Sequence, residues 1–174
     1  ARHTLPGEFR RIDPASAILA TARQIMAQNG VPAKLRPVLV GYSSGAVLAY
    51  TSLVQAKAGS FGGGIGLGFC PDLETHKPLC HGESLTHVKN PKGPGFVYET
   101  VPRLSTPFIA LQGGKDRVCD PPATNRFIAA VDGAKIINLP NVGHGFSVPK
   151  NWMSQYADAY RSLALGTVHA ESAQ

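Results

Sequence analysis

The sequence predicts an α/β fold in which a mostly parallel sheet is flanked by helices. Three short apolar runs have the composition of buried strands, namely 38–40, 108–112 and 134–139. Each run ends in a turn that contains glycine, and segments with a helical pattern lie before, between and after the runs. Strands that alternate with helices are typical of parallel sheets, because each helix carries the chain back along the sheet.

The length and composition are those of one globular domain. With 174 residues, of which 43% are hydrophobic and 16% charged, the chain can bury a core of its own. No apolar run approaches the roughly 20 residues of a membrane span, so we expect a soluble domain. The formal charge of +6 comes from scattered Lys and Arg residues. This scatter favours a solvated surface over a nucleic-acid face and leaves an anionic membrane surface as a candidate partner.

Helices are expected near both ends of the chain. The segment 1–13 has little periodicity and is interpreted as a loop, after which Asp13 suits the N-cap of a helix that begins at Pro14. Apolar residues recur at helical spacing until Asn29 interrupts the pattern. The segment 151–165 has the apolar spacing of a last helix packed on the core, and the tail after it is expected to fray.

The strand at 38–40 leads into a Gly-x-Ser-x-Gly turn formed by Gly41, Ser43 and Gly45, and a helix is expected over 44–57. In a strand, turn and helix of this kind the serine lies on a strained elbow with its hydroxyl exposed. We expect both glycines to make room for the tight backbone. The alternative is a buried structural serine that precedes a helix.

The residues after the other two strands supply an acid and a base. Asp116 follows the second apolar run and His144 the third, so the order along the chain is serine, aspartate, histidine. This is the order of the catalytic triad in α/β-hydrolases, in which each member follows the carboxyl end of a strand. Asp72 is a competing candidate for the acid, whereas Asp120 precedes two prolines and is interpreted as the N-cap of the next helix.

The region between the elbow helix and the second run has unusual composition. The glycine-rich segment 60–69 is interpreted as a buried strand and not as a phosphate loop, since it lacks the Lys and Ser/Thr that end such loops. The connection 71–107 contains a hairpin candidate at 92–98 and is assigned to a cap that selects substrate, with a disordered excursion as the alternative. The histidines outside the triad are assigned to exposed loops or chain ends: His3, His76, His81, His87 and His169.

Only about 36 residues precede the elbow strand, which is room for one helix and a loop. An α/β-hydrolase has several strands before this point, so we interpret 1–174 as the carboxyl-terminal part of one such domain. We expect that its amino-terminal strands were removed or are supplied by another polypeptide, and a genuinely minimal hydrolase is the least favoured alternative. The backbone N–H of Ser44 is the expected oxyanion donor, and the second donor of the oxyanion hole lies outside this sequence.

The three cysteines are Cys70, Cys80 and Cys119. Their spacing, with each other and with the histidines, matches no metal motif, and we expect neither a metal nor a cofactor. In an exported protein Cys70 and Cys119 could pair, or Cys80 could pair with one of them. The odd cysteine is either a free thiol or the partner of a cysteine in another segment.

Together these residues predict a serine hydrolase. His144 would act as the base that takes the proton of Ser43, and Asp116 would orient the imidazole and stabilise its charged form. The substrate would be an acyl or aminoacyl ester, although the same triad also serves peptidases and thioesterases. The alternative is a hydrolase-fold module that binds a lipid or a protein without turnover.

Several stretches resemble a known bacterial family. The stretches are 37–46, 67–73, 77–80, 118–121 and 142–149. Together they resemble the virulence protein family of VirJ and AcvB, most closely the first hydrolase-like half of AcvB-type proteins. The resemblance extends from Asp13 to the last helix.

This resemblance implies a periplasmic α/β-hydrolase-fold protein of a Gram-negative bacterium. AcvB-type members are linked to hydrolysis of lysyl-phosphatidylglycerol, and VirJ to type IV secretion. The implied partners are therefore an ester or lipid substrate and a secretion-system protein. The nucleophile, acid and histidine positions of the family correspond to Ser43, Asp116 and His144 in this sequence.

Overall fold

The computed structural model describes residues 14–74, 78 and 85–167. The helices are α1 (Pro14–Gln28), α2 (Ser44–Gln55), α3 (Pro121–Ala129) and α4 (Met153–Leu165), with a short 3-10 helix η2 (Pro149–Asn151) before the last. The strands are β1 (Val38–Tyr42), β2 (Gly63–Leu67), β3 (Asp72–Leu73), β4 (His87–Lys89), β5 (Phe96–Tyr98), β6 (Arg103–Gly113) and β7 (Asp132–Leu139). The predictions for Asp13, Cys80, His3, His76, His81, His169 and the two chain ends lie outside the described residues.

The main sheet is parallel and has the strand order β1-β2-β6-β7. The predicted fold class is therefore confirmed. In the described part of the chain no strand precedes β1, and β1 forms one edge of the sheet. Because the strands are parallel, their carboxyl ends all meet at one edge of the sheet, and the turns after β1, β6 and β7 lie there together.

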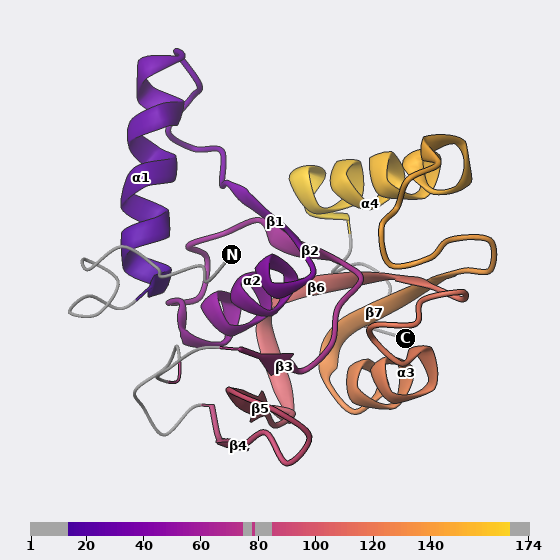
Figure 1. Ribbon diagram of the computed structural model, residues 1–174. Helices are drawn as coiled ribbons and strands as arrows, with labels where there is room; N and C mark the ends of the chain where they lie inside the picture. The colour runs from indigo at the N-terminus through magenta and orange to yellow at the C-terminus, as the bar shows by residue number, and fades with distance from the viewer. Residues whose placement is uncertain (1–13, 75–77, 79–84, 168–174) are drawn as a thin grey trace.

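Helices cover both faces of this sheet (Figure 1). On one face α2 and α3 pack against Phe108 and Ala110 of β6. On the other face α4 packs against the alternate residues of β6, Ile109 and Leu111. Of the helices that the structure describes, none is both long and apolar enough to cross a membrane.

The glycines of β2 let the helices approach the sheet closely on both sides. A Cβ at Gly63 would lie 2.4 Å from the side chain of Leu163 on α4, and one at Gly64 would lie 2.7 Å from Leu53 on α2. The expectation of a glycine-rich buried strand is confirmed, although β2 is shorter than the predicted 60–69. Single backbone hydrogen bonds continue on either side of it, from the N–H of Gly62 to the carbonyl of Pro37 and from the N–H of Gly68 to the carbonyl of Leu111.

Strand β6 begins earlier than the sequence indicated. We expected a strand over 108–112, but β6 starts at Arg103 and continues through Pro107. The register with β7 is irregular between Arg103 and Phe108. Proline has no N–H to donate to a neighbouring strand, so inside a sheet it is tolerated at irregularities of this kind. For the same reason a proline usually indicates the end of a strand, and the predicted strand began only after Pro107.

The connection 71–107 has more regular structure than expected. Its strands β3, β4 and β5 form an antiparallel sheet in the order β3-β5-β4. A hairpin is therefore present, but β4 and β5 form it over 87–98, so it begins earlier than the predicted 92–98. This small sheet adds Leu73 and Tyr98 to the core on the α2 side. Strands of two or three residues are too short to show alternation in a sequence. The assignment of this segment to a substrate-selecting cap stays a prediction.

His87 does not lie in an exposed loop as expected. It lies on β4, where its ring centroid is 5.2 Å from that of Phe96 and 6.1 Å from that of Tyr98. The pairing of β4 with β5 brings these aromatic side chains to the histidine. The imidazole therefore packs against two aromatic rings of the small sheet.

Candidate active site

Ser43 occupies a strained elbow between β1 and α2. Its backbone has φ 53° and ψ −121°, a left-handed φ that L-residues other than glycine rarely adopt. The N–H of Ser43 donates to the carbonyl of Leu67 at 2.9 Å, which ties the elbow to the end of β2. Backbone strain of this kind is typical of a nucleophile that must project from the end of a sheet.

The two glycines of the motif have different roles. A Cβ at Gly41 would lie 1.9 Å from the carbonyl oxygen of Gly45, so only glycine fits where β1 passes the start of α2. A Cβ at Gly45 itself would meet no atom within 4 Å. The expectation that both glycines provide room is therefore correct for Gly41 and wrong for Gly45. A side chain at Gly41, on the strand side of the turn, would point into the backbone at the start of α2.

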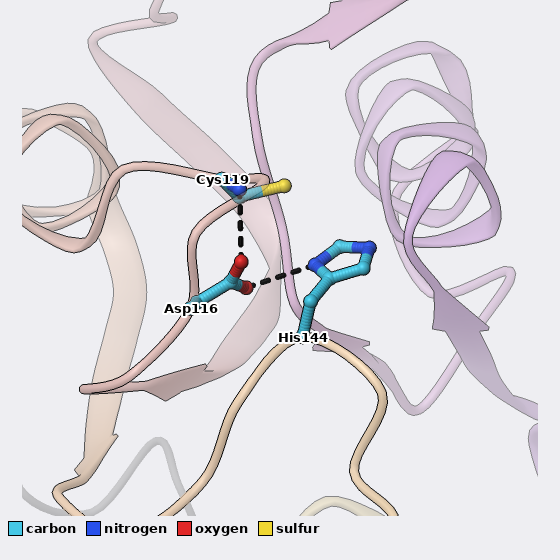
Figure 2. A group of neighbouring side chains, drawn as sticks. All are labelled: Asp116, Cys119 and His144. Atoms are coloured by element: carbon cyan, nitrogen blue, oxygen red, sulfur yellow. Dashed lines mark hydrogen bonds and ion pairs between the residues drawn. The ribbon is translucent and has the colours of Figure 1, made fainter.

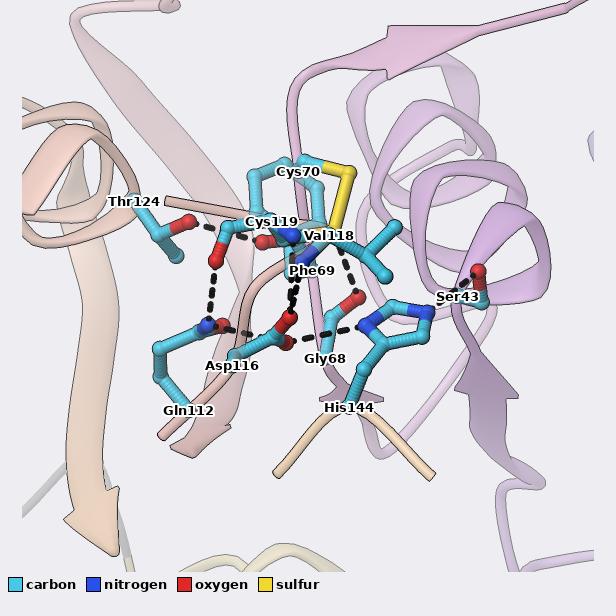
Figure 3. Close-up of polar contacts among 10 residues, drawn as sticks. All are labelled: Ser43, Gly68, Phe69, Cys70, Gln112, Asp116, Val118, Cys119, Thr124 and His144. Atoms are coloured by element: carbon cyan, nitrogen blue, oxygen red, sulfur yellow. Dashed lines mark hydrogen bonds and ion pairs between the residues drawn. A yellow bond between two sulfur atoms is a disulfide. The ribbon is translucent and has the colours of Figure 1, made fainter. Parts of the chain in front are cut away.

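The structure brings Ser43, His144 and Asp116 together (Figure 3). The Nε2 atom of His144 lies 3.0 Å from the Oγ of Ser43, and its Nδ1 lies 2.9 Å from the Oδ2 of Asp116. The three residues are far apart in the sequence and follow β1, β7 and β6 respectively. Their side chains form one continuous hydrogen-bonded chain at the carboxyl edge of the sheet.

The competing aspartates have other places in the fold. Asp72 lies in β3, where it pairs with Val97 of the small sheet. Asp120 caps α3, and its Oδ2 accepts a hydrogen bond from the N–H of Ala123 at 3.0 Å. The predicted N-cap is confirmed, and of the three aspartates it is Asp116 that contacts His144.

The carboxylate of Asp116 is fully buried and is surrounded by hydrogen-bond donors. Its Oδ1 accepts from the N–H groups of Val118 at 2.8 Å and Cys119 at 2.9 Å, and its Oδ2 accepts from the Nε2 of Gln112 at 3.2 Å. Burial opposes ionisation. The bonds from Cys119, His144 and Val118 outweigh it, so the pKa of Asp116 lies below the usual 3.8.

An ionised carboxylate fixes the roles of the two imidazole nitrogens. Because the carboxylate of Asp116 can only accept hydrogen bonds, the Nδ1 of His144 donates to it. The Nε2 atom is then left to accept the hydroxyl proton of Ser43. This is the tautomer that a general base needs.

The loop that carries His144 is held by aromatic residues. The indole Nε1 of Trp152 donates to the carbonyl of Phe146 at 2.9 Å, and the Trp152 and Phe146 rings are 5.5 Å apart. The ring centroid of Tyr42 lies 5.4 Å from that of the His144 imidazole. An apolar pocket of about 440 Å³ lies beside this loop, and its lining consists of Val40, Tyr42, Leu67, Gly145, Phe146, Trp152 and Tyr156.

Ser44, the expected oxyanion donor, is the first residue of α2. The first N–H groups of a helix have no carbonyl partner within it, and they lie at the positive end of the helix dipole. The N–H of Ser44 therefore suits an anionic oxygen formed beside Ser43. The role of Ser44 as oxyanion donor stays a prediction.

Two supporting residues were not identified from the sequence. Gln112 is completely buried at the end of β6, and its amide donates to both Asp116 and the carbonyl of Cys119. Gly68 lies directly against the ring of His144. A polar residue at the end of an otherwise apolar strand was the available signal for Gln112. Nothing local in the sequence marks Gly68.

Asp116, Cys119 and His144 place ligand-type atoms within 4.8 Å of one another (Figure 2). Cys119, however, forms a disulfide with Cys70, so its sulfur is not a thiolate ligand. The other two residues already bond to each other. The cluster is therefore explained by the triad and the disulfide.

Comparison of the three-dimensional structure with solved structures identifies similar folds. The esterase domain of a Rhodothermus marinus protein matches with a TM-score of 0.53 and 14% identity, over 84% of this chain and 66% of that one. The acylaminoacyl peptidase of Pyrococcus horikoshii matches with a TM-score of 0.56 and 13% identity, over 85% of this chain and 26% of the peptidase. A puromycin hydrolase matches with a TM-score of 0.56 and 20% identity, over 90% of this chain and 25% of the hydrolase.

These similarities show that the chain has the α/β-hydrolase fold. The chain spans about two thirds of the esterase domain and about a quarter of the other two proteins. No family model matches the sequence, and the search of curated proteins found no match. At identities of 20% or less, the similarity concerns the fold and not the reaction.

Proposed function

We propose that this protein is a serine hydrolase that cleaves acyl or aminoacyl esters. The observation that carries the proposal is the hydrogen-bonded chain from Ser43 through His144 to Asp116, with contacts of 3.0 and 2.9 Å. Each contact is within the range for a nucleophile, its base and the group that orients the base. The strained φ of Ser43 supports the same role, because a structural serine has no need of it.

In the first half of the reaction Ser43 becomes acylated. As its Oγ attacks the ester carbonyl carbon, the proton moves to the Nε2 of His144, and the carbonyl oxygen becomes an oxyanion. The N–H of Ser44 donates to this oxyanion. When the tetrahedral intermediate collapses, the bond to the leaving alcohol breaks and His144 returns the proton to the alcohol oxygen.

In the second half water replaces the alcohol. His144 takes a proton from water, whose oxygen attacks the acyl carbon, and the bond to the Oγ of Ser43 then breaks. The proton on Nε2 passes to Ser43, which restores the starting state. Throughout, Asp116 stays ionised and stabilises the charged imidazolium, in agreement with its lowered pKa.

For the substrate we propose an aminoacylated phospholipid of the lysyl-phosphatidylglycerol type, met in the periplasm. The resemblance to VirJ and AcvB supports this choice. The disulfide supports the compartment, because disulfides persist where the surroundings are oxidising. The esterase and peptidase neighbours agree with a carbonyl substrate in general.

Labelling with a fluorophosphonate probe tests the proposal. We expect the probe to modify Ser43, because it reacts with serines whose hydroxyl is activated by a base. Ser43→Ala should abolish labelling, whereas Ser154→Ala, which removes an exposed hydroxyl on α4, should leave it unchanged. Turnover would then be measured with short acyl esters and with lysyl-phosphatidylglycerol in vesicles.

A folded protein that the probe does not label would refute the hydrolase. The remaining function would be a hydrolase-fold module that binds lipid or a secretion-system protein without turnover. Binding of vesicles that contain lysyl-phosphatidylglycerol, unaffected by Ser43→Ala, would identify that second function.

A further inference from the structure

The Cys70–Cys119 disulfide joins the two segments that support the Asp116–His144 pair (Figure 3). Cys70 follows β2, and Cys119 lies in the turn between β6 and α3, 49 residues further on. In the sequence the cysteines left several pairings open. The structure makes this pairing, directly beside the triad.

The Cys119 end of the disulfide holds the acid. The N–H of Cys119 and that of its neighbour Val118 both donate to the Oδ1 of Asp116. The carbonyl of Cys119 accepts from Gln112, which also donates to Oδ2 of Asp116. Cys119 is only 1% exposed, so this residue lies in the core although its neighbour Val118 is exposed. A shift of the Cys119 backbone would therefore alter two of the contacts around the carboxylate.

The Cys70 end supports the base. Gly68, two residues earlier, has φ +60°, and a Cβ there would lie 3.1 Å from the Nδ1 of His144. The backbone of Gly68 is thus the surface on which the imidazole rests, on the same side as the bond to Asp116. Thr124 of α3 fixes the next residue, since its Oγ1 donates to the carbonyl of Phe69 at 2.8 Å.

We propose that the Cys70–Cys119 disulfide positions the Asp116 carboxylate against His144, so that the reactivity of Ser43 depends on the oxidation of this pair. The inference rests on the proposed hydrolase function. The two cysteines are positioning residues, because neither contacts the reacting atoms. The bond fixes the distance between the turn that holds the acid and the segment that backs the imidazole, a distance otherwise maintained by hydrogen bonds and packing.

The proposal is tested by reducing the Cys70–Cys119 disulfide. A dithiol such as dithiothreitol donates two electrons and two protons, the S–S bond becomes two thiols, and the dithiol becomes a cyclic disulfide. The protein should carry Cys80→Ser, so that no third thiol can exchange with the pair. Cys70→Ala combined with Cys119→Val removes the bond by a second route while keeping the buried position apolar.

The first readout is the rate at which the fluorophosphonate labels Ser43. We expect loss of the disulfide, by either route, to slow labelling by about ten- to a hundred-fold, the range expected when a catalytic group is displaced by about 1 Å. Circular dichroism should show a folded protein in each case. The double variant should be insensitive to dithiothreitol.

The second readout concerns Asp116 and does not depend on labelling. The carboxyl carbon of Asp116 can be titrated by NMR, with Asp116→Asn used to assign its signal. Because the N–H of Cys119 helps to keep this pKa below 3.8, we expect the pKa to rise when the disulfide is lost. A role confined to stability would leave the pKa of the folded protein unchanged.

The matched control is Asp120→Ala, which removes the cap of α3 at the residue after Cys119. It should lower thermal stability without slowing the labelling of Ser43. Equal slowing in this variant would overturn the proposal, because the effect would be general loosening of the turn. Unchanged labelling and an unchanged Asp116 pKa after loss of the disulfide would also overturn it.

The remaining outcomes separate the hydrolase function from the positioning role of the disulfide. If the oxidised protein is not labelled but the pKa of Asp116 rises on reduction, the hydrolase is refuted and the positioning role stands. If the oxidised protein is not labelled and the pKa is unchanged, both are refuted. A protein that unfolds by both routes would overturn the positioning role, since the bond would then be a requirement for folding.

Discussion

Substitution of Gly41 by alanine should damage both the fold and the elbow. The new Cβ would lie 1.9 Å from the oxygen and 2.2 Å from the carbon of the Gly45 carbonyl, whereas Cβ contacts under 3.0 Å essentially never occur. The strand and the helix start would have to separate by about 1 Å. Both atoms of the carbonyl belong to backbone, so no side-chain rotation can relieve the contact.

The expected cost is at the upper end of the range for overpacking, about 3 kcal/mol. For a chain of this length about 1 kcal/mol lowers Tm by about 2–4 °C, so Gly41→Ala should lower Tm by about 6–12 °C. Since Ser43 lies in the same turn, its labelling by the fluorophosphonate should also slow.

Gly45→Ala is the matched comparison, because it adds the same methyl group to the same motif. Its Cβ would meet no atom within 4 Å, and alanine favours the helix more than glycine does. We expect an unchanged or slightly higher Tm and unchanged labelling. Thermal unfolding followed by circular dichroism compares the two variants. Equal Tm values for Gly41→Ala and the unmodified protein would refute the steric argument.

Other predictions follow from the same contacts. Asp116→Asn should slow ester hydrolysis by up to about 10⁴-fold with an unchanged circular dichroism spectrum, because the amide supports the wrong tautomer of His144; near-normal rates would exclude Asp116 as the acid. The pKa of Asp116 is lowered in the folded state, so its contribution to stability is present above about pH 3.8 and is lost as the pH falls through the folded-state pKa. The free energy of unfolding, measured in urea, should therefore differ less between the unmodified protein and Asp116→Asn as the pH falls. A difference that is independent of pH would contradict this. Gly68→Ala should raise the strain at φ +60° and push the imidazole, which a fall in kcat larger than any rise in KM would reveal. Asp120→Ala should cost about 1 kcal/mol through loss of the α3 cap, visible as a Tm lower by about 2–4 °C, and no change in Tm would show that the cap contributes little.

Local signals in the sequence predicted most of the fold. The start of α2 after a Gly-x-Ser-x-Gly turn and the cap at Asp120 depend on residues a few positions apart, and both are present. The boundaries of β6 were misjudged, since Pro107 looked like a strand end. The small sheet was only partly predicted, because β3 and β4 are held by pairing with β5 and not by their own composition.

The candidate triad was predicted by order along the chain, while its geometry came from the tertiary structure. Ser43, Asp116 and His144 follow strands that the parallel sheet aligns at one edge, so the sequence alone determined which residues could meet there. The sequence already favoured Asp116 over Asp72, but only the folded chain could pair Cys70 with Cys119 and place Gln112 and Gly68 around the acid and the base. The disulfide joins residues 49 positions apart, and the hydrogen bonds of His144 to Asp116 and Ser43 span 28 and 101 positions. The places of Gln112 and Gly68 depend on how buried atoms pack. Neither long-range contact nor packing is encoded in a local pattern.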